Sequence, residues 1–141
     1  MKKSIYNILA LIALISTAAS CDKVDDNGNL GGLWQLTEWR ALPSGEVRAN
    51  KAQAIFYAVQ LNLMKFSIHN DIDTYHLARF IHRNDSLILG KIYARPDEHE
   101  VSAAELAKYG VPPSGAFAID NLTSSRMILR SDSAILTFRK Y

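Results

Sequence analysis

Along most of the chain, apolar residues alternate with polar ones, the period-two spacing of a half-buried β-strand. Short polar segments that hold Gly, Pro, Asn, Asp or Ser interrupt this alternation and are typical of tight turns. The predicted strands are Leu33–Leu42, Ile55–Ile68, Thr74–Arg83, Ser86–Arg95, Gly115–Asp120, Arg126–Ser131 and Ala134–Lys140. The pattern therefore predicts mostly β structure, with antiparallel neighbours.

The longest of these runs, Ile55–Ile68, changes parity part-way. One set of its apolar residues is odd-numbered and a second set is even-numbered, namely Ile55, Tyr57, Val59, Leu61 and Leu63 against Met64, Phe66 and Ile68. A β-bulge inserts one extra residue and turns the following side chains to the other face. We therefore expect one bent strand here, with a bulge near Leu63 and Met64.

A single short helix is expected after the fourth of these strands. Ser102 and Glu105 have the spacing of a capping box, and Val101 can pack on Leu106 as a hydrophobic staple. Gly110, followed by two prolines, supplies the left-handed residue that ends a helix. These signals predict a helix from about Ala103 to Tyr109.

Two hairpins give expected registers. A two-residue loop at 132–133 pairs Met127 with Phe138 and Leu129 with Leu136. A two-residue loop at 84–85 predicts the pairs Leu77 with Ile92, Ile81 with Ile88, and Phe80 with Leu89. Because the second hairpin has apolar residues on both faces, we expect the sheet to curl into a small antiparallel meander β-barrel, partly covered by the helix.

The first 21 residues resemble the signal of a bacterial lipoprotein. Two lysines precede eight apolar residues, Ile8–Ile15, which are too few for a transmembrane helix of ~20 residues. We interpret residues 1–20 as a cleaved signal peptide. The small residues before Cys21 resemble a lipobox, in which the cysteine is acylated, typically with palmitate, and becomes the mature N-terminus. The alternative is a chance cysteine behind an ordinary secretory signal.

Residues 21–32 are polar and glycine-rich, and we expect a flexible tether there. Acidic residues behind a lipidated cysteine resemble the surface-export signal of Bacteroides-like bacteria, whereas Asp22 alone resembles the inner-membrane retention signal of enteric bacteria. Asp25 and Asp26 add to the acidic cluster and favour the outer membrane. A linker without sorting content remains the other interpretation.

The net charge of the chain limits the kinds of binding partner that we expect. Once Lys2 and Lys3 leave with the signal, the mature chain of 121 residues holds 14 basic and 14 acidic side chains. A formally neutral protein lacks the basic surface that nucleic acids require. The expected partner is a membrane, reached through the lipid anchor.

A family resemblance rests on several segments together. Gly32-Leu33-Trp34 matches the short motif that opens the first lipocalin strand, and it follows a lipobox and an acidic Gly/Asn-containing tether. With the two terminal strands, these features resemble the lipocalin-like lipoproteins of Bacteroides-type bacteria, a small uncharacterised family. The resemblance implies a barrel of about eight strands over residues 33–141 and a binding role. It also implies that Trp34 stacks on an arginine near the C-terminus, Arg139 or alternatively Arg130.

The candidate ligand site centres on Arg79, which the predicted register places opposite Gly90 and on one face with Tyr75, Leu77 and Ile92. A cation among apolar residues must reach water, pair with a carboxylate, or meet an anionic group of a ligand. We expect Arg79 and Tyr75 to line the barrel mouth and to orient a small acidic amphiphile, whose tail contacts Leu77 and Ile92. An outward-facing or paired Arg79 is the alternative.

The sequence gives little support for a metal site or a catalytic site. His76 and His82 would lie ~20 Å apart along one strand, too far for a shared metal. No nucleophile, acid and base occur in a known catalytic spacing. We expect no cofactor, no metal and no enzymatic activity. The predicted function is binding of an apolar or amphipathic ligand; the alternative is an envelope interaction or structural module with a filled barrel.

Overall fold

The computed structural model describes residues 27–48 and 54–141, which form nine strands, one α-helix and one short 3-10 helix. The elements are η1 (Gly28–Leu30), β1 (Gly32–Ala41), β2 (Val47–Arg48), β3 (Ile55–Gln60), β4 (Leu63–Ile68), β5 (Tyr75–Arg83), β6 (Ser86–Arg95), α2 (Ala103–Ala107), β7 (Ala116–Leu122), β8 (Arg126–Arg130) and β9 (Ala134–Lys140). No helix among these described residues is long and apolar enough to cross a membrane.

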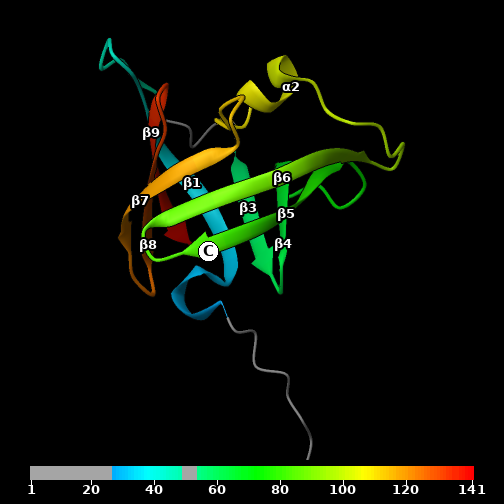
Figure 1. Ribbon diagram of the computed structural model, residues 1–141, viewed down its shortest axis with the longest axis horizontal. Coiled ribbons are helices and arrows are strands. Elements are labelled where there is room, and N and C mark those ends of the chain that lie inside the picture. Colours follow the sequence, from blue (N-terminus) through cyan, green and yellow to red (C-terminus); the bar gives the residue numbers. More distant parts are fainter. Residues whose placement is uncertain (1–26, 49–53) are drawn as a thin grey trace, which may run out of the picture.

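The strands form a ring in which every neighbouring pair is antiparallel (Figure 1). β3 to β9 pair in chain order, and β1 pairs with both β3 and β9, which closes a ring of eight strands. The short β2 pairs with the far half of β1 and lies outside the ring. The predicted antiparallel meander of about eight strands with one short helix is therefore confirmed.

The expected bent strand between Ile55 and Ile68 is instead a hairpin. Leu61 and Asn62 form the turn between β3 and β4, and Leu61 adopts a φ of 53°. The pairs Tyr57 with Phe66 and Val59 with Met64 have numbers that sum to an odd value. Inward positions are therefore odd-numbered on β3 and even-numbered on β4. A tight turn, and not a bulge, causes the change of parity.

The predicted register is confirmed for one of the two hairpins and only partly for the other. On β8 and β9, Met127 pairs with Phe138 and Leu129 with Leu136, as expected. On β5 and β6 the predicted register holds next to the turn, where Phe80 faces Leu89 and Ile81 faces Ile88, but it slips by one residue between Ala78 and Phe80.

This irregularity, centred on Arg79, has a direct consequence for the candidate site. Leu77 pairs with Tyr93, and Ile92 pairs with Ala78. The predicted pair of Leu77 with Ile92 is therefore wrong. One extra residue on β6, where Gly90 and Lys91 together oppose Arg79, moves every pair beyond it onto the other parity.

The predicted helix is confirmed, although its α-helical part ends at Ala107. The Ser102 hydroxyl accepts a hydrogen bond from the Glu105 amide at 3.3 Å, as the capping box requires. Gly110 follows with a φ of 82°, where a built Cβ would lie 2.8 Å from the Leu136 side chain. A glycine is therefore needed for both its conformation and its contact with the core.

The packed domain begins earlier than residue 33. Residues 28–30 of the expected tether form η1, and Leu30 is fully buried. The Leu30 carbonyl accepts a hydrogen bond of 2.8 Å from the indole nitrogen of the fully buried Trp34. The predicted signal peptide and the tether up to residue 26 lie outside the described residues.

Trp34 meets a cation, but the cation is Lys140. The Lys140 ammonium lies 4.2 Å from the centre of the indole ring and donates hydrogen bonds to the Asn29 and Gly31 carbonyls. Burial lowers the pKa of Lys140 below its ordinary value. The predicted contact with Arg139 is wrong because Trp34 and Lys140 are cross-strand partners, whereas Arg139 faces outward.

The side chains of both predicted arginines bind elsewhere. Arg139 donates a hydrogen bond of 2.8 Å to the Gln35 side chain. Arg130 makes two hydrogen bonds to Asp120, and these lower the pKa of the Asp120 carboxyl. The cation that contacts the Trp34 ring is therefore Lys140, one residue after Arg139 on β9.

Replacing Lys140 by Met is expected to lower the free energy of unfolding by ~1 to 2 kcal/mol, because the cation–π contact and the hydrogen bonds to two carbonyls are lost. Arg139→Met removes the neighbouring exposed cation and should change stability by less than ~0.5 kcal/mol. Urea unfolding followed by tryptophan fluorescence measures both variants. A larger loss in the Arg139 variant would contradict the assignment.

Candidate functional site

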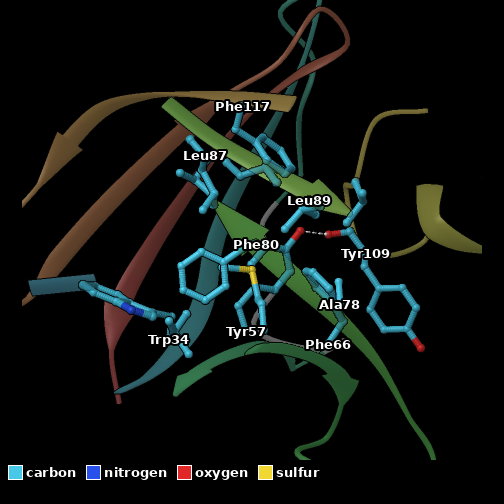
Figure 2. Close-up of a cluster of buried hydrophobic side chains, with 14 of the residues drawn as sticks. Trp34, Tyr57, Phe66, Ala78, Phe80, Leu87, Leu89, Tyr109 and Phe117 are labelled. Carbon is cyan, nitrogen blue, oxygen red and sulfur yellow. Dashed lines mark hydrogen bonds between the residues drawn. The ribbon is translucent and has the colours of Figure 1, made fainter. Parts of the chain in front are cut away.

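The interior of the barrel is filled by its own side chains (Figure 2). Trp34, Tyr57, Phe66 and Phe138 are all fully buried. The Tyr57 ring lies edge-on to Phe66, with centroids 4.6 Å apart, and 4.7 Å from the Phe138 ring. These aromatic residues form a packed core in the volume where a ligand-binding barrel would have its lumen.

The segment from Ser102 to Pro113 lies over one end of this core and is held there by two polar contacts. The Tyr57 hydroxyl donates a hydrogen bond of 2.7 Å to the Tyr109 carbonyl, which Figure 2 draws as a dashed line. His76, only 3% exposed, lies 2.8 Å from a Glu105 carboxylate oxygen through its Nε2. Among the described residues, the other ring nitrogen of His76 has no hydrogen-bond partner.

Burial shifts the titration of the two tyrosines in this region. It raises the pKa of Tyr57 far above the ordinary value of 10.0. It also raises the pKa of Tyr109, with a smaller contribution from the nearby Glu105 carboxylate. Both phenols therefore stay protonated in the folded protein, and Tyr57 keeps its hydrogen bond to the Tyr109 carbonyl.

Two hollows occur on the outer face of the barrel, over β3 to β6. They have volumes of about 430 and 540 Å³ and share Leu63 and Leu77, so together they form one groove, called here the outer groove. It is lined by Ala58, Gln60, Leu61, Leu63, Lys65, Ile72, Tyr75, Leu77, Ala78, Arg79, Gly90, Lys91, Tyr93 and Arg95. Most of these are outward-facing residues of adjacent strands, joined by Ile72 from the β4–β5 loop.

The outer groove combines exposed apolar side chains with cations. Leu61, Ile72 and Tyr93 are 58%, 76% and 40% exposed, which is unusual for large apolar residues outside an interface or a binding site. The lining holds four cationic residues and no carboxylate. Its chemistry fits a molecule that has an anionic group and an apolar part.

The four cations differ in their partners. Lys91 lies 3.7 Å from the Glu100 carboxylate, and Arg95 pairs with Glu98. The Lys65 ammonium lies 4.7 Å from the centre of the Tyr75 ring. Arg79 is exposed and makes no ion pair or side-chain hydrogen bond within the described part of the chain. Its guanidinium is therefore available to bind an anion.

Three of the four predicted ligand-binding residues, Tyr75, Leu77 and Arg79, line the outer groove. Ile92 does not, because it is 4% exposed and belongs to the core. The expectation that all four share one face is therefore wrong for Ile92. The extra residue on β6, opposite Arg79, places Ile92 on the inward parity and leaves the other three residues, all on β5, outside.

The predicted opening beside Arg79 is present. Gly90 lines the groove, and a Cβ built on it would lie 3.5 Å from the Arg79 carbonyl oxygen. Arg79 lines the same hollow, and a glycine at position 90 adds no side chain to it.

Sequence reasoning missed Leu63, Lys65 and Lys91 as groove residues. The turn at Leu61 and Asn62 was not recognised in the sequence. Recognising it would have put Leu63 and Lys65 on the outer face beside Leu77. Cys21 lies outside the described residues. No group of three potential metal-binding side chains occurs within residues 27–48 and 54–141.

Comparison with known proteins agrees with this architecture, since the family model of the lipocalin-like domain matches residues 13–141. The chain belongs to this lipocalin-like family. No curated protein matches it. The resemblance stated from the sequence is thus confirmed for the family, whose fold is typical of small-ligand-binding barrels and generally serves binding and not catalysis.

Three solved structures share the fold. A lipocalin-like protein from Bacteroides uniformis has a TM-score of 0.59 and 20% identity, covering 81% of this chain and 100% of that one. An uncharacterized protein from Bacteroides eggerthii has a TM-score of 0.55 and 23% identity, covering 79% and 98%. A protein from Burkholderia xenovorans has a TM-score of 0.50 and 11% identity, covering 78% and 81%.

Tyr57→Phe tests the contact that holds the covering segment on the core. At neutral pH the variant should be less stable by ~1 kcal/mol, because the Tyr109 carbonyl loses its buried donor. Above pH ~10 the wild type should lose up to ~1.4 kcal/mol per pH unit more than the variant, since only the unfolded Tyr57 ionises there. Urea unfolding at several pH values measures both effects.

The matched control is Tyr141→Phe, which removes an exposed hydroxyl and should follow the wild type at every pH. Parallel stability curves for the wild type and Tyr57→Phe above pH ~10 would contradict the protected phenol.

Proposed function

We propose that this lipocalin-like protein is a lipid-anchored lipoprotein of the bacterial cell envelope that binds a small anionic amphiphile in the outer groove. The observation that carries the ligand class is the composition of that groove, where apolar side chains surround an unpaired Arg79 and no carboxylate lines the surface. An interior filled by Tyr57, Phe66 and Phe138 supports a site on the outside.

Arg79 and its apolar neighbours would act on different parts of the ligand. A guanidinium forms two parallel hydrogen bonds to a carboxylate, sulfate or phosphate, which fixes the direction of the bound group. Leu63 and Leu77, shared by both hollows, would cover the apolar part, and each methylene removed from water contributes up to ~0.8 kcal/mol. Gly90 leaves room for the anionic head beside Arg79.

A second candidate function is an interaction or structural module of the envelope. The filled interior is the observation that favours it, because such a barrel needs no ligand to complete its core. This alternative predicts that the outer groove is not used by small molecules, so the two functions differ in one direct binding measurement.

The anchor is proposed from the sequence. The lipobox-like ending at Cys21 supports acylation of its sulfur, and the acidic cluster that follows supports the outer membrane as the location. Several acyl chains on one cysteine bind a membrane much more firmly than a single chain does.

Arg79→Met should weaken binding of a long-chain fatty acid or a bile-acid-like molecule about fivefold to tenfold, because an exposed charge-assisted hydrogen bond is lost. Arg83→Met removes a neighbouring exposed arginine of the same strand outside the groove and serves as the matched control. Isothermal titration of all three proteins measures the affinities. Equal affinity in the wild type and Arg79→Met would remove Arg79 from the site, and no binding in any of them would favour the structural module.

Metabolic labelling with a fatty-acid analogue tests the anchor. The wild type should carry the label and sediment with membranes, whereas Cys21→Ala should carry none and be soluble or unprocessed, since the chain holds no other cysteine. Label retained in Cys21→Ala would contradict lipidation at this residue.

A further inference from the structure

The described chain begins at one end of the barrel, called here the base. η1 lies at the opposite end from α2 (Figure 1). The side chain of Asn27 donates a hydrogen bond of 2.6 Å to the Leu61 carbonyl, so the β3–β4 turn lies beside the point where the N-terminal segment leaves. Only five residues separate Cys21 from Asn27, and a fully extended chain from one to the other spans at most ~20 Å.

Leu61 is an unusual residue for this turn. It has a φ of 53°, a left-handed conformation that favours Gly or Asn, and its side chain is 58% exposed. A leucine there contributes little to the core and adds backbone strain. Its side chain is instead placed where an apolar partner outside the barrel could contact it.

Arg126 and Arg139 form a second unusual feature at the base. They are direct cross-strand partners on β8 and β9, and both are exposed. Like charges in this position repel one another unless an anion lies between them. Arg139 donates to Gln35, and neither arginine has a carboxylate partner within the described residues. β3, β1, β9 and β8 are consecutive in the ring, so β3 lies two strand spacings, ~10 Å, from the strand of Arg139 and three, ~15 Å, from that of Arg126.

The charges of the two barrel ends differ strongly. Among the described residues, the connections at the base, 61–62, 84–85 and 123–125, carry one carboxylate, Asp85. The connections at the opposite end carry eight, namely Glu46, Asp71, Asp73, Asp97, Glu98, Glu100, Glu105 and Asp132, with Lys108 as their one lysine or arginine. An anionic surface would therefore attract the base and repel the opposite end.

We propose that the base, through Leu61, Arg126 and Arg139, is a docking surface for anionic phospholipid headgroups, with the acidic end directed into water. The orientation rests on the proposed lipid anchor, which keeps the base within ~20 Å of the bilayer. The segment between Cys21 and Asn27 holds three aspartates and one lysine, so it does not itself bind anionic lipid. The arginine pair supplies the attraction, and the Leu61 side chain contacts the apolar part of the interface.

The test uses the lipidated full-length mature protein on vesicles that contain phosphatidylglycerol. Because Cys21 is acylated and no other cysteine exists, Leu61→Cys provides one thiol for an environment-sensitive fluorophore. Lys108→Cys, on the exposed far end, is the matched control. A quencher attached to the lipid headgroups should reduce the Leu61 signal at least about threefold more than the Lys108 signal.

The double variant Arg126→Gln, Arg139→Gln should remove at least about half of the difference in quenching between the two labels. Salt at ~1 M should do the same, because it shortens the electrostatic screening length to ~3 Å. Arg40→Gln with Arg48→Gln, two exposed arginines of the far half of the molecule, is the control and should leave it unchanged. Equal quenching at both labels, or stronger quenching at Lys108, would overturn the proposal. Disulfide dimers through Leu61→Cys that form equally well without vesicles would assign the base to a second copy.

A Cys21→Ala arm separates this surface from the anchor. Without acylation, the protein labelled at Leu61 should still show salt-sensitive quenching at high vesicle concentration, while vesicles of neutral lipid give none. That result would support the docking surface even if metabolic labelling refuted lipidation. If the anchored protein floats with vesicles but its Leu61 label stays in water, the anchor is right and the docking surface is wrong.

Discussion

The structure depends on the packing of Tyr57 at the centre of the barrel. Its ring contacts Phe66 and Phe138, and its hydroxyl reaches the Tyr109 carbonyl of the segment that covers the barrel end. One side chain thus joins three strands and the covering segment. An unpaired phenol in this position would be costly, so the core and the covering segment must form together. Filling the interior in this way gives a short barrel a sufficient core without disulfides.

A filled interior moves recognition to the outside of the sheet. In a meander the outward positions of neighbouring strands are adjacent. Leu63 of β4 therefore forms a continuous surface with Leu77 and Arg79 of β5. The bulge on β6 at Gly90 and Lys91, opposite Arg79, and the missing side chain at Gly90 hollow this surface. The same irregularity that breaks the regular register therefore produces the outer groove.

Strand positions, the helix and the β8–β9 register could be predicted from the sequence, because alternation, a capping box and turn residues are local signals. The turn at Leu61 could not, since leucine rarely adopts a positive φ and no glycine or proline marks the turn. Arg79 was found by its charge, but the face of Ile92 was not, because a bulge leaves no clear mark in one sequence. Lys140, and not Arg139, contacts Trp34 because Lys140 continues the inward parity of Leu136 and Phe138 along β9.

Residues 21–141 carry 14 basic and 14 acidic side chains, yet these charges are unevenly distributed. Carboxylates gather in the loops around α2, whereas Arg126 and Arg139 lie near the exit of the N-terminal segment. The net charge therefore does not describe how the protein would orient beside a charged surface. That orientation depends on the direction of the dipole between the acidic and the basic end. The outer groove extends from Leu61 along β4 and β5 toward Ile72. With the base on the bilayer, one end of that groove would open at the headgroups and the other in water, so an amphiphile leaving the membrane could enter it without crossing the packed core.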